Sequence, residues 1–383
     1  MGWSSFRKTG LTFDLPAQSV RGYTLFTPNG GSASYLIDMA GRIVHRWDLG
    51  AFTAFYARLQ PSGNLLALTN PAGAARPEIA PGAVPTFEQG LRMHGGNATA
   101  LQEFDWDGNI VWTYENPAIH HDFVRLPNGN TLLPLSIELP EDIARQVRGG
   151  IRAPGKQRPM HSDDILEIDP KGEEVRRHHL WQLLDPRRDP ICALEHRGEW
   201  THLNGLAVTR DGDVYFSCRE NSRVGLIDGK TGALKQKFAL TNHQHNPSVL
   251  PNGNLQLFDN GHHIQGFNRS RIIEVNPQSS SIVWEYTGSP PQQFYSSHIS
   301  GADRLPGDNV LICEGSAGRI FEVTRRGQIV WEFINPFTVM QRGQPSTSVF
   351  RAHRYLPDDP AIAGRDLDPA RYAGLNRMYG LID

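Results

Sequence analysis

Short stretches of alternating apolar and polar residues recur along the chain and are separated by tight-turn sequences. In the first kind of unit, an acidic or glycine-containing turn joins two such stretches, and the second stretch often ends in tryptophan. Six copies are present: LIDMAGRIVHRW from Leu36, FDWDGNIVWTY from Phe104, EIDPKGEEV from Glu167, LIDGKTGALK from Leu226, EVNPQSSSIVWEY from Glu274 and EVTRRGQIVWEF from Glu322. Alternation bounded by Asp-Gly and Asn-Gly turns is typical of β-hairpins. The chain is therefore predicted to contain six hairpins of this kind.

A second hairpin, usually with a Pro-x-Gly or Asp-Gly turn, follows these units after a gap. Its full copies start at Ala57, His121, His202, His245 and His298, and a degenerate copy, FRAHRYLPDD from Phe350, keeps only the first strand. Four strands per repeat, at internal periods of about 40 to 65 residues, predict an all-β fold, a six-bladed β-propeller. Four tryptophans at outer strand ends are predicted to pack between blades: Trp47, Trp112, Trp284 and Trp331.

The strand missing from the sixth copy has a replacement near the other end of the chain. The segment GYTLFTP, Gly22 to Pro28, reads as a strand, so we predict that it pairs with the strand from Phe350 and closes the propeller. The whole chain, 1–383, is predicted to be one β-propeller domain. Residues 1–20 and 359–383 are expected to be tails outside the ring, the second with a helix starting near Pro369.

Charge and cysteine content narrow the classes of partner. A formal net charge of −2 gives no overall field that recruits nucleic acid or an anionic membrane, so a small-molecule partner is favoured. The first residues lack the apolar core of a secretory signal, which predicts a cytoplasmic protein. Three separated cysteines without CxxC spacing do not indicate a disulfide framework. These features give no expectation for the oligomeric state.

Polar residues, chiefly histidines, recur at one end of the predicted blades. His121, His202, His245 and His298 each begin the strand after the long gap, and His353 lies in the degenerate copy. A single histidine at a strand end is more often structural, but no packing rule requires an imidazole there in successive copies. We expect these side chains at one mouth of the central channel. The next strand should end at the same mouth, with Ser217, Arg219, Asp259, Asn260 and Glu314.

Three insertions interrupt the repeat and are expected to cover the same face. They span residues 71–96, 137–162 and 181–200, and Glu138 to Val147 has helical spacing. A small lid that excludes water would strengthen electrostatic contacts beneath it. The histidines inside or beside these insertions, His161, His178, His179 and His196, are interpreted as structural.

The chain resembles the bacterial arylsulfotransferases, a cofactor-free family that moves a sulfuryl group from a phenyl sulfate to a phenol. The resemblance covers most of the predicted ring. It rests on GYTLFTP with YLIDMAGRIVHRW, HHDFVRLPNGNTLL, HLNGLAV with SCR, QHNPSVLPNGNLQLFDNG, and SRIIEVNPQSSSIVWEY. The well-known members are periplasmic and carry an extra N-terminal β domain, whereas this chain begins almost directly with the repeat.

The resemblance implies roles for particular residues. His245 of QHNPSVLPNGN corresponds to the histidine that takes the sulfuryl group covalently, and His298 is the alternative. Two supporting histidines, His121 and His202, and Arg219 of SCR would hold the sulfate oxygens. The neighbouring polar and aromatic residues are predicted to contact substrate: His298, His353, Tyr295 and Asn260.

Two other interpretations remain open. Converging neutral imidazoles are also a site for a divalent metal, so the chain is alternatively a lyase or hydrolase. In that case Zn²⁺, Mn²⁺ or Ni²⁺ would be bound by His121, His202, His245 and His298. The third interpretation is a binding or scaffold propeller, in which these histidines are dispensable. The first interpretation, transfer to a small phenolic substrate, requires no cofactor, whereas the second requires a divalent metal.

Overall fold

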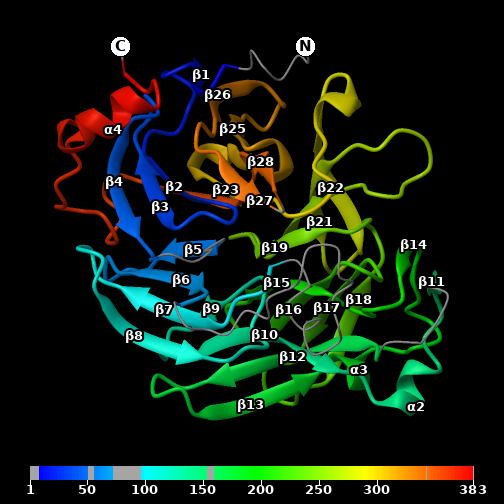
Figure 1. The fold of residues 1–383 in the computed structure, drawn as a ribbon. Helices are drawn as coiled ribbons and strands as arrows, with labels where there is room; N and C mark the ends of the chain where they lie inside the picture. Colours follow the sequence, from blue (N-terminus) through cyan, green and yellow to red (C-terminus); the bar gives the residue numbers. More distant parts are fainter. Residues whose placement is uncertain (1–7, 51–55, 72–95, 153–158, 342, 383) are drawn as a thin grey trace. The chain divides into compact units, whose positions relative to one another are not determined.

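The computed structural model describes residues 8–50, 56–71, 96–152, 159–341 and 343–382. Within these ranges the regular structure is mostly antiparallel β-sheet, as the alternating pattern predicts (Figure 1). The chain divides into two compact units, one of residues 1–72, 101–113 and 296–383, and the other of residues 73–100 and 114–295. Among the described residues, five four-stranded sheets and one five-stranded sheet follow the strand order of propeller blades, three mainly in each unit.

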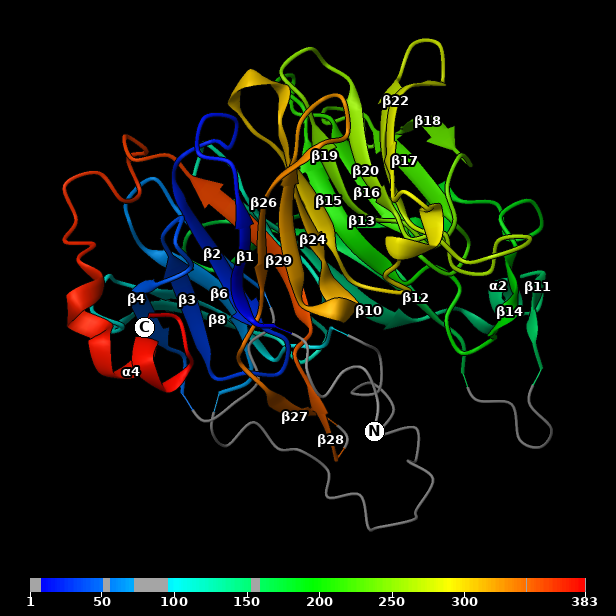
Figure 2. The same cartoon turned by 90° about the horizontal axis from the view of Figure 1, so that it is seen from above.

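The first unit holds the blades from both ends of the chain. Its three blades are β29(Val349–Tyr355)-β2(Tyr23–Pro28)-β3(Ala33–Ile37)-β4(Ile43–Asp48), β5(Tyr56–Leu59)-β6(Leu65–Thr69)-β7(Ala100–Phe104)-β8(Ile110–Glu115), and β23(Gly301–Arg304)-β24(Val310–Glu314)-β25(Arg319–Val323)-β26(Ile329–Ile334). A separate hairpin of β27(Val339–Gln341) and β28(Gln344–Ser346) lies between β26 and β29 in the chain (Figure 2).

The second unit holds three consecutive blades. They are β9(Val124–Arg125)-β10(Thr131–Glu138)-β12(His161–Ile168)-β13(Glu174–His179), β15(Leu203–Val208)-β16(Val214–Cys218)-β17(Arg223–Ile227)-β18(Leu234–Phe238), and β19(His245–Val249)-β20(Leu255–Asp259)-β21(Arg271–Asn276)-β22(Ser281–Thr287). All six predicted copies of each repeat half therefore coincide with observed strands.

Acidic turn residues explain why the hairpins form where they do. In the turn after β3, Asp38 Oδ1 accepts hydrogen bonds from the backbone N–H groups of Ala40 (3.0 Å) and Arg42 (2.9 Å). In the turn after β12, Asp169 Oδ1 accepts in the same way from Lys171 (2.8 Å) and Glu173 (2.9 Å). A short carboxylate that bonds its own following backbone fixes a tight turn.

The degenerate sixth copy does obtain a partner from the start of the chain. β2 pairs antiparallel with β29, with Tyr23 opposite Tyr355 and Leu25 opposite His353. A buried ion pair supports this pairing, because Arg354 Nη1 lies 3.1 Å from Glu322 Oε2 on β25, and Arg354 Nε donates to Thr24 Oγ1 (2.8 Å).

Parts of the two segments predicted as tails are built into the first unit. β1(Gly10–Asp14) pairs with β26 and makes that sheet five-stranded. At the other end, η5(Pro369–Tyr372) and α4(Ala373–Met378) lie against β4 (Figures 1 and 2). Asn376 binds the outer edge of β4 as a strand would, because its side chain accepts from Ile43 N (2.8 Å) and donates to Ile43 O (3.1 Å). Exposed sheet edges need such a cover, and the sequence pattern gave no sign of it.

The tryptophan prediction is confirmed most clearly at two positions. Trp47 and Trp331 are fully buried, and their indole N–H groups donate to Asp105 O (3.1 Å) and Met39 O (2.9 Å) in adjoining blades. Each ring thus fills the space between blades and also has its polar atom satisfied.

The insertions contain little regular structure. Between β10 and β12, the described residues of the second insertion form α2(Glu141–Ala144) and β11(Gly149–Ile151), so the helix is shorter than predicted. The third contains α3(Leu180–Leu183) and β14(Ile191–His196), and β14 runs parallel to β11. Most of the insertion at 71–96 lies outside the described residues. Among the helices that are described, none is long and apolar enough to cross a membrane.

Candidate functional site

The first strands of the three blades in the second unit lie side by side and hold the predicted histidines near one another. Asp122 Oδ2 accepts from Leu206 N (2.9 Å), which ties the loop of His121 to β15. Asn204 Nδ2 donates to Gln244 O (2.8 Å), which ties β15 to the residue before His245. The histidines of three successive repeats, 121, 202 and 245, therefore belong to one connected polar region.

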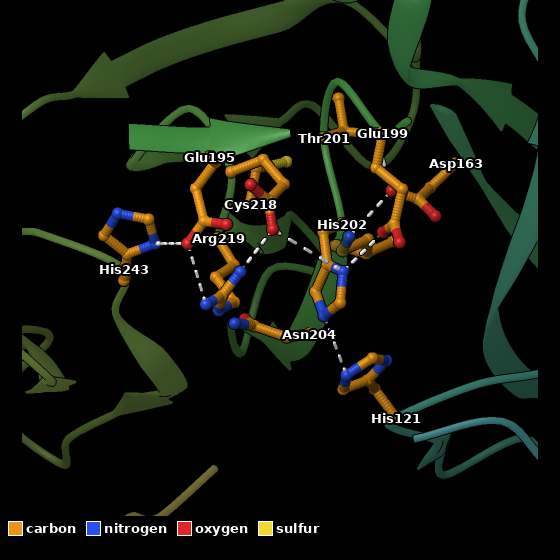
Figure 3. A network of polar contacts seen from close by, with 12 residues as sticks. His121, Asp163, Glu195, Glu199, Thr201, His202, Asn204, Cys218, Arg219 and His243 are labelled. Atoms are coloured by element: carbon orange, nitrogen blue, oxygen red, sulfur yellow. Dashed lines mark hydrogen bonds and ion pairs between the residues drawn. The ribbon is translucent and has the colours of Figure 1, made fainter. Parts of the chain in front are cut away.

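Three histidines form a continuous chain of contacts between two carboxylates. His202 Nε2 lies 3.1 Å from His121 Nε2, and His121 Nδ1 lies 2.8 Å from His120 Nδ1. His120 Nε2 lies 3.0 Å from Asp163 Oδ1, and the far end is closed by a contact between His202 Nδ1 and Glu199. Figure 3 shows His121 and His202 directed at each other.

Three histidines of this region have a left-handed backbone conformation, which residues other than glycine rarely adopt. The φ angles are 56° at His121, 51° at His202 and 58° at His243. Such residues cost of order 1 kcal/mol or more each and are concentrated at functional sites. The left-handed conformation is thus shared by three histidines of this region.

Arg219 lies beside this chain, at the end of β16, where the sequence predicts it. Its Nη2 lies 3.0 Å from Glu195 Oε1, and its Nη1 contacts Glu220. Burial, with the charge of Arg219 as the next cause, lowers the pKa of His202. Burial also raises the pKa of Glu220. The arginine thus compensates two carboxylates and keeps the adjacent imidazole a weak base.

His245 is held in one orientation by two contacts at the same ring nitrogen. Its side chain is 1% exposed, and its Nδ1 lies 2.8 Å from Asn260 Oδ1 and 3.2 Å from His243 O. Both neighbours are acceptors, so Nδ1 carries the hydrogen and Nε2 keeps its lone pair. Asn260, predicted at the end of β20, therefore fixes the tautomer of His245.

The other predicted site residues make contacts outside the group formed by His121, His202 and Arg219. Tyr295 OH lies 2.7 Å from His262 Nδ1. In the first unit, His298 is exposed and contacts Ser297 Oγ (2.9 Å), whereas His353 is buried with its Nδ1 2.6 Å from Asp303 Oδ2. The roles of His298 and His353 at the channel stay predictions.

Three of the residues expected at the mouth serve packing and strand pairing. Ser217 Oγ accepts from Gln244 Nε2 (3.0 Å), Asp259 Oδ2 accepts from Arg271 Nε (2.7 Å), and Glu314 Oε2 lies 3.1 Å from Arg319 Nη1. Each polar group is thus paired within its own or the neighbouring blade.

Sequence reasoning missed a second group of site residues. His243, His262 and His263 lie around Glu195, and Cys192 lies 3.5 Å from His263 Nδ1. Figure 3 shows His243 and Arg219 both directed at Glu195. Two local patterns could have marked this group: the adjacent residues His262 and His263, and the His-x-His sequence of His243 and His245. The third insertion supplies Cys192, Glu195 and Glu199, so within the second unit it does reach the predicted site.

Within the part of the chain that the structure describes, the four histidines predicted as metal ligands do not form a group whose ligand atoms lie close together. Among the described residues, two groups have ligand atoms within 4.8 Å of one another, namely Cys192 with His243 and His263, and Glu195 with His262 and His263. Neither group includes His121, His202, His245 or His298.

Asp163 provides a pH-dependent test of the chain. Burial alone would raise the pKa of Asp163, but hydrogen bonds from His120, Thr201 and Leu203 N outweigh it and lower the pKa to about 2. The unfolded-state pKa is about 3.9, so the carboxylate contributes about 2 kcal/mol that is fully present above about pH 5 and is lost as the pH falls through about 2. The difference in unfolding free energy between wild type and Asp163→Asn should shrink by that amount between about pH 5 and pH 2. Denaturant titrations at each pH measure it, and a constant difference contradicts the assignment.

The blades and the oriented histidines define the class of protein. It is a β-propeller with a buried site of histidines, carboxylates and an arginine on its first strands. The family model described as Arylsulfotransferase (ASST) matches residues 82–336, which is more than half of the chain. The chain belongs to the arylsulfotransferase family.

Individual relatives are distant. The chain is similar to arylsulfate sulfotransferase AssT of Escherichia coli O6:H1 (strain CFT073), with 22% identity over 318 residues, covering 60% of this chain and 52% of that protein. It thus spans about half the length of this curated relative.

Solved structures support the fold. A Bacteroides caccae protein of unknown function has a TM-score of 0.53 at 14% identity, with 87% of this chain and 98% of that chain covered. A virginiamycin B lyase from Staphylococcus aureus has a TM-score of only 0.42 at 15% identity, with 74% of this chain and 70% of that chain covered, so it bears on neither fold nor function here.

Proposed function

We propose that this chain transfers a sulfuryl group from an aryl sulfate to a phenol, and that His245 carries the group between them. The observation that supports this most is the contact of His245 Nδ1 with Asn260 Oδ1 at 2.8 Å. It orients the ring and leaves the Nε2 lone pair for attack. Membership of the arylsulfotransferase family supports the same reaction class.

In the first step, His245 Nε2 attacks the sulfur of the aryl sulfate. The N–S bond forms as the bond between sulfur and the aryl oxygen breaks, and the aryl oxide leaves. A phenolate leaves more easily if it receives a proton. We propose that this proton comes from the pair His121 and His202, whose Nε2 atoms lie 3.1 Å apart.

In the second step, the acceptor phenol loses its proton and its oxygen attacks the same sulfur. The N–S bond breaks, the lone pair returns to His245 Nε2, and the phenol proton restores the histidine chain. No net proton is consumed over the two steps. A reaction divided at a covalent histidine gives ping-pong kinetics.

Arg219 is proposed to neutralise the charge of the sulfate oxygens. Two of its five N–H donors serve Glu195 and Glu220 among the described residues, so others remain for an anion. A fixed guanidinium in a buried site stabilises developing charge at little reorganisation cost. The transfer itself needs no metal in this scheme.

The rest of the substrate site is proposed from the repeat. We propose that the six blades close into a ring through the β2–β29 pairing. His298, His353 and Tyr295 would then contact the phenolic substrate at the same mouth. A cytoplasmic location is proposed as well. The family assignment does not favour the metal-dependent lyase or hydrolase alternative.

The test is an assay with a nitrophenyl sulfate donor and a phenol acceptor. The proposal expects release of nitrophenol that depends on the acceptor, parallel lines in double-reciprocal plots, and retention of activity in the presence of a chelator. Release without any formation of the acceptor's sulfate ester would identify a hydrolase instead. Absence of both products, with a panel of phenols, would refute the proposed function.

A further inference from the structure

A second cluster of ligand-type side chains lies on the Glu195 side of Arg219, apart from the contact of His121 with His202. The ligand atoms of Cys192, His243 and His263 all lie within 4.8 Å of one another, and Cys192 Sγ is 3.5 Å from His263 Nδ1. Glu195 Oε1 lies 3.6 Å from His243 Nδ1 and 3.8 Å from His263 Nδ1. Zn–N bonds of about 2.0–2.1 Å and Zn–S bonds of about 2.3 Å place two ligands of a tetrahedral zinc about 3.3 to 3.6 Å apart. The distance between Cys192 and His263 has that spacing, and the other pairs of ligand atoms lie within 4.8 Å.

His243 shows independently that this cluster lacks a component. Its side chain is 1% exposed, and neither ring nitrogen has a hydrogen-bond partner among the described residues. Leaving a buried polar atom unpaired costs about 1–3 kcal/mol.

The backbone brings the ligands together from three segments. The N–H of Cys192, on β14, donates to Glu220 O (2.8 Å), and the N–H of His243 donates to Ser222 Oγ (3.1 Å). The N–H of Gly261 donates to Asn242 O (3.0 Å), which holds the loop of His263 beside His243. φ is 58° at His243 and 63° at His263, so two of the three ligands have left-handed backbone.

The chemistry of the donors indicates both the ligand set and the metal. A thiolate with two imidazoles suits Zn²⁺ rather than Mg²⁺ or Ca²⁺, which take oxygen ligands. His262 belongs to the alternative group with Glu195, but its Nδ1 already contacts Tyr295 OH at 2.7 Å. Glu195 supplies negative charge next to both ligand imidazoles. Cys192 and His263 are only partly buried, which gives a cation access from solvent.

We propose that Cys192, His243 and His263 bind one zinc ion and leave its fourth position open. The site does not depend on the proposed sulfuryl transfer, because none of these three side chains takes part in it. It is coupled to that chemistry through Glu195, whose Oε1 also lies 3.0 Å from Arg219 Nη2. Zinc at this position would compete with the arginine for the carboxylate.

The experiment is metal binding by the full chain after removal of metals. Titration with Zn²⁺ should give one tight equivalent by calorimetry and elemental analysis. With Co²⁺ as probe, a thiolate-to-cobalt charge-transfer band should appear in the near ultraviolet. Cys192→Ser should abolish the band, and His243→Ala or His263→Ala should weaken Zn²⁺ binding at least tenfold, the loss that even outer-sphere changes cause.

The matched control is His196→Ala, which removes an exposed imidazole from the same strand, β14, and should leave binding unchanged. Thermal unfolding of each variant shows that it is folded. Absence of a tight equivalent in the wild-type chain would overturn the proposal. A charge-transfer band of equal strength in wild type and Cys192→Ser would overturn it as well.

Discussion

Replacing His245 by alanine is expected to lower the rate of sulfuryl transfer by at least about 10⁴-fold, the loss seen when a nucleophile that acts with its neighbours is removed. The reason is that no other group in the proposed scheme forms the N–S bond. The measurement is kcat with a nitrophenyl sulfate donor and a saturating phenol acceptor. Circular dichroism and thermal unfolding should show a folded protein, because the variant removes one side chain at the start of β19.

A second variant separates orientation from nucleophilicity. Asn260→Leu keeps His245 but removes the acceptor 2.8 Å from its Nδ1, so only the longer contact with His243 O at 3.2 Å still orients the ring. We expect a drop in kcat of about 10²-fold or more, smaller than that of His245→Ala. His196→Ala serves as the control, since its imidazole is exposed on β14. A His245→Ala protein that retains more than about a tenth of the wild-type rate would show that the sulfuryl group is not carried by His245.

Replacing Arg219 by methionine is expected to lower kcat/KM by about 10²–10³-fold, the usual effect of removing one group that stabilises developing anionic charge. The conservative variant Arg219→Lys should recover only part of the loss, because an ammonium lacks the planar fork of donors. The loss should appear mainly in kcat if the guanidinium binds the transition state more tightly than the substrate.

The matched control for this arginine is Arg177→Met. Arg177 also bridges two carboxylates in the second unit, with its Nη2 2.6 Å from Glu174 and its Nη1 3.2 Å from Asp164. Both variants lose one cation and two ion pairs, so a general charge effect would change them equally. Equal kcat/KM values for the two variants would remove Arg219 from the proposed chemistry.

The blades were predictable because their signals are local. Alternation of apolar and polar residues and the Asp-containing turns, such as those at Asp38 and Asp169, are encoded within about ten residues. The pairing of β2 with β29 followed from counting, since one repeat lacked its partner strand. The cover of β4 by Asn376 carries no such signal, because a single asparagine in a polar helix has no periodic pattern.

The sequence predicted which residues belong to the candidate site better than it predicted which of their atoms are in contact. His121, His202, Arg219 and His245 were placed by their equivalent positions in successive repeats, and the structure connects them within one unit. Which atoms meet depends on side-chain torsions and on left-handed residues, which a repeat pattern does not specify. The contact between His121 and His202 was therefore not predicted, and their contacts with sulfate stay a prediction.

The insertions account for most of what the sequence did not reveal. Residues 181–200 have no counterpart in the other copies, so no comparison between repeats could mark Cys192, Glu195 or Glu199. Their importance appears only when β14 is seen beside the loops of Arg219 and His243. Loops often carry functional residues without a regular sequence pattern.

The central claim is that His245 carries the sulfuryl group, and one measurement tests it most directly. The wild-type chain is mixed with an aryl sulfate donor without acceptor, quenched at alkaline pH, digested and analysed by peptide mass spectrometry. The account predicts a mass increase of one SO₃ group on His245, which disappears when a phenol is added before quenching and is absent from His245→Ala. An adduct on His298 instead, or active enzyme that shows no adduct on any histidine, would contradict it.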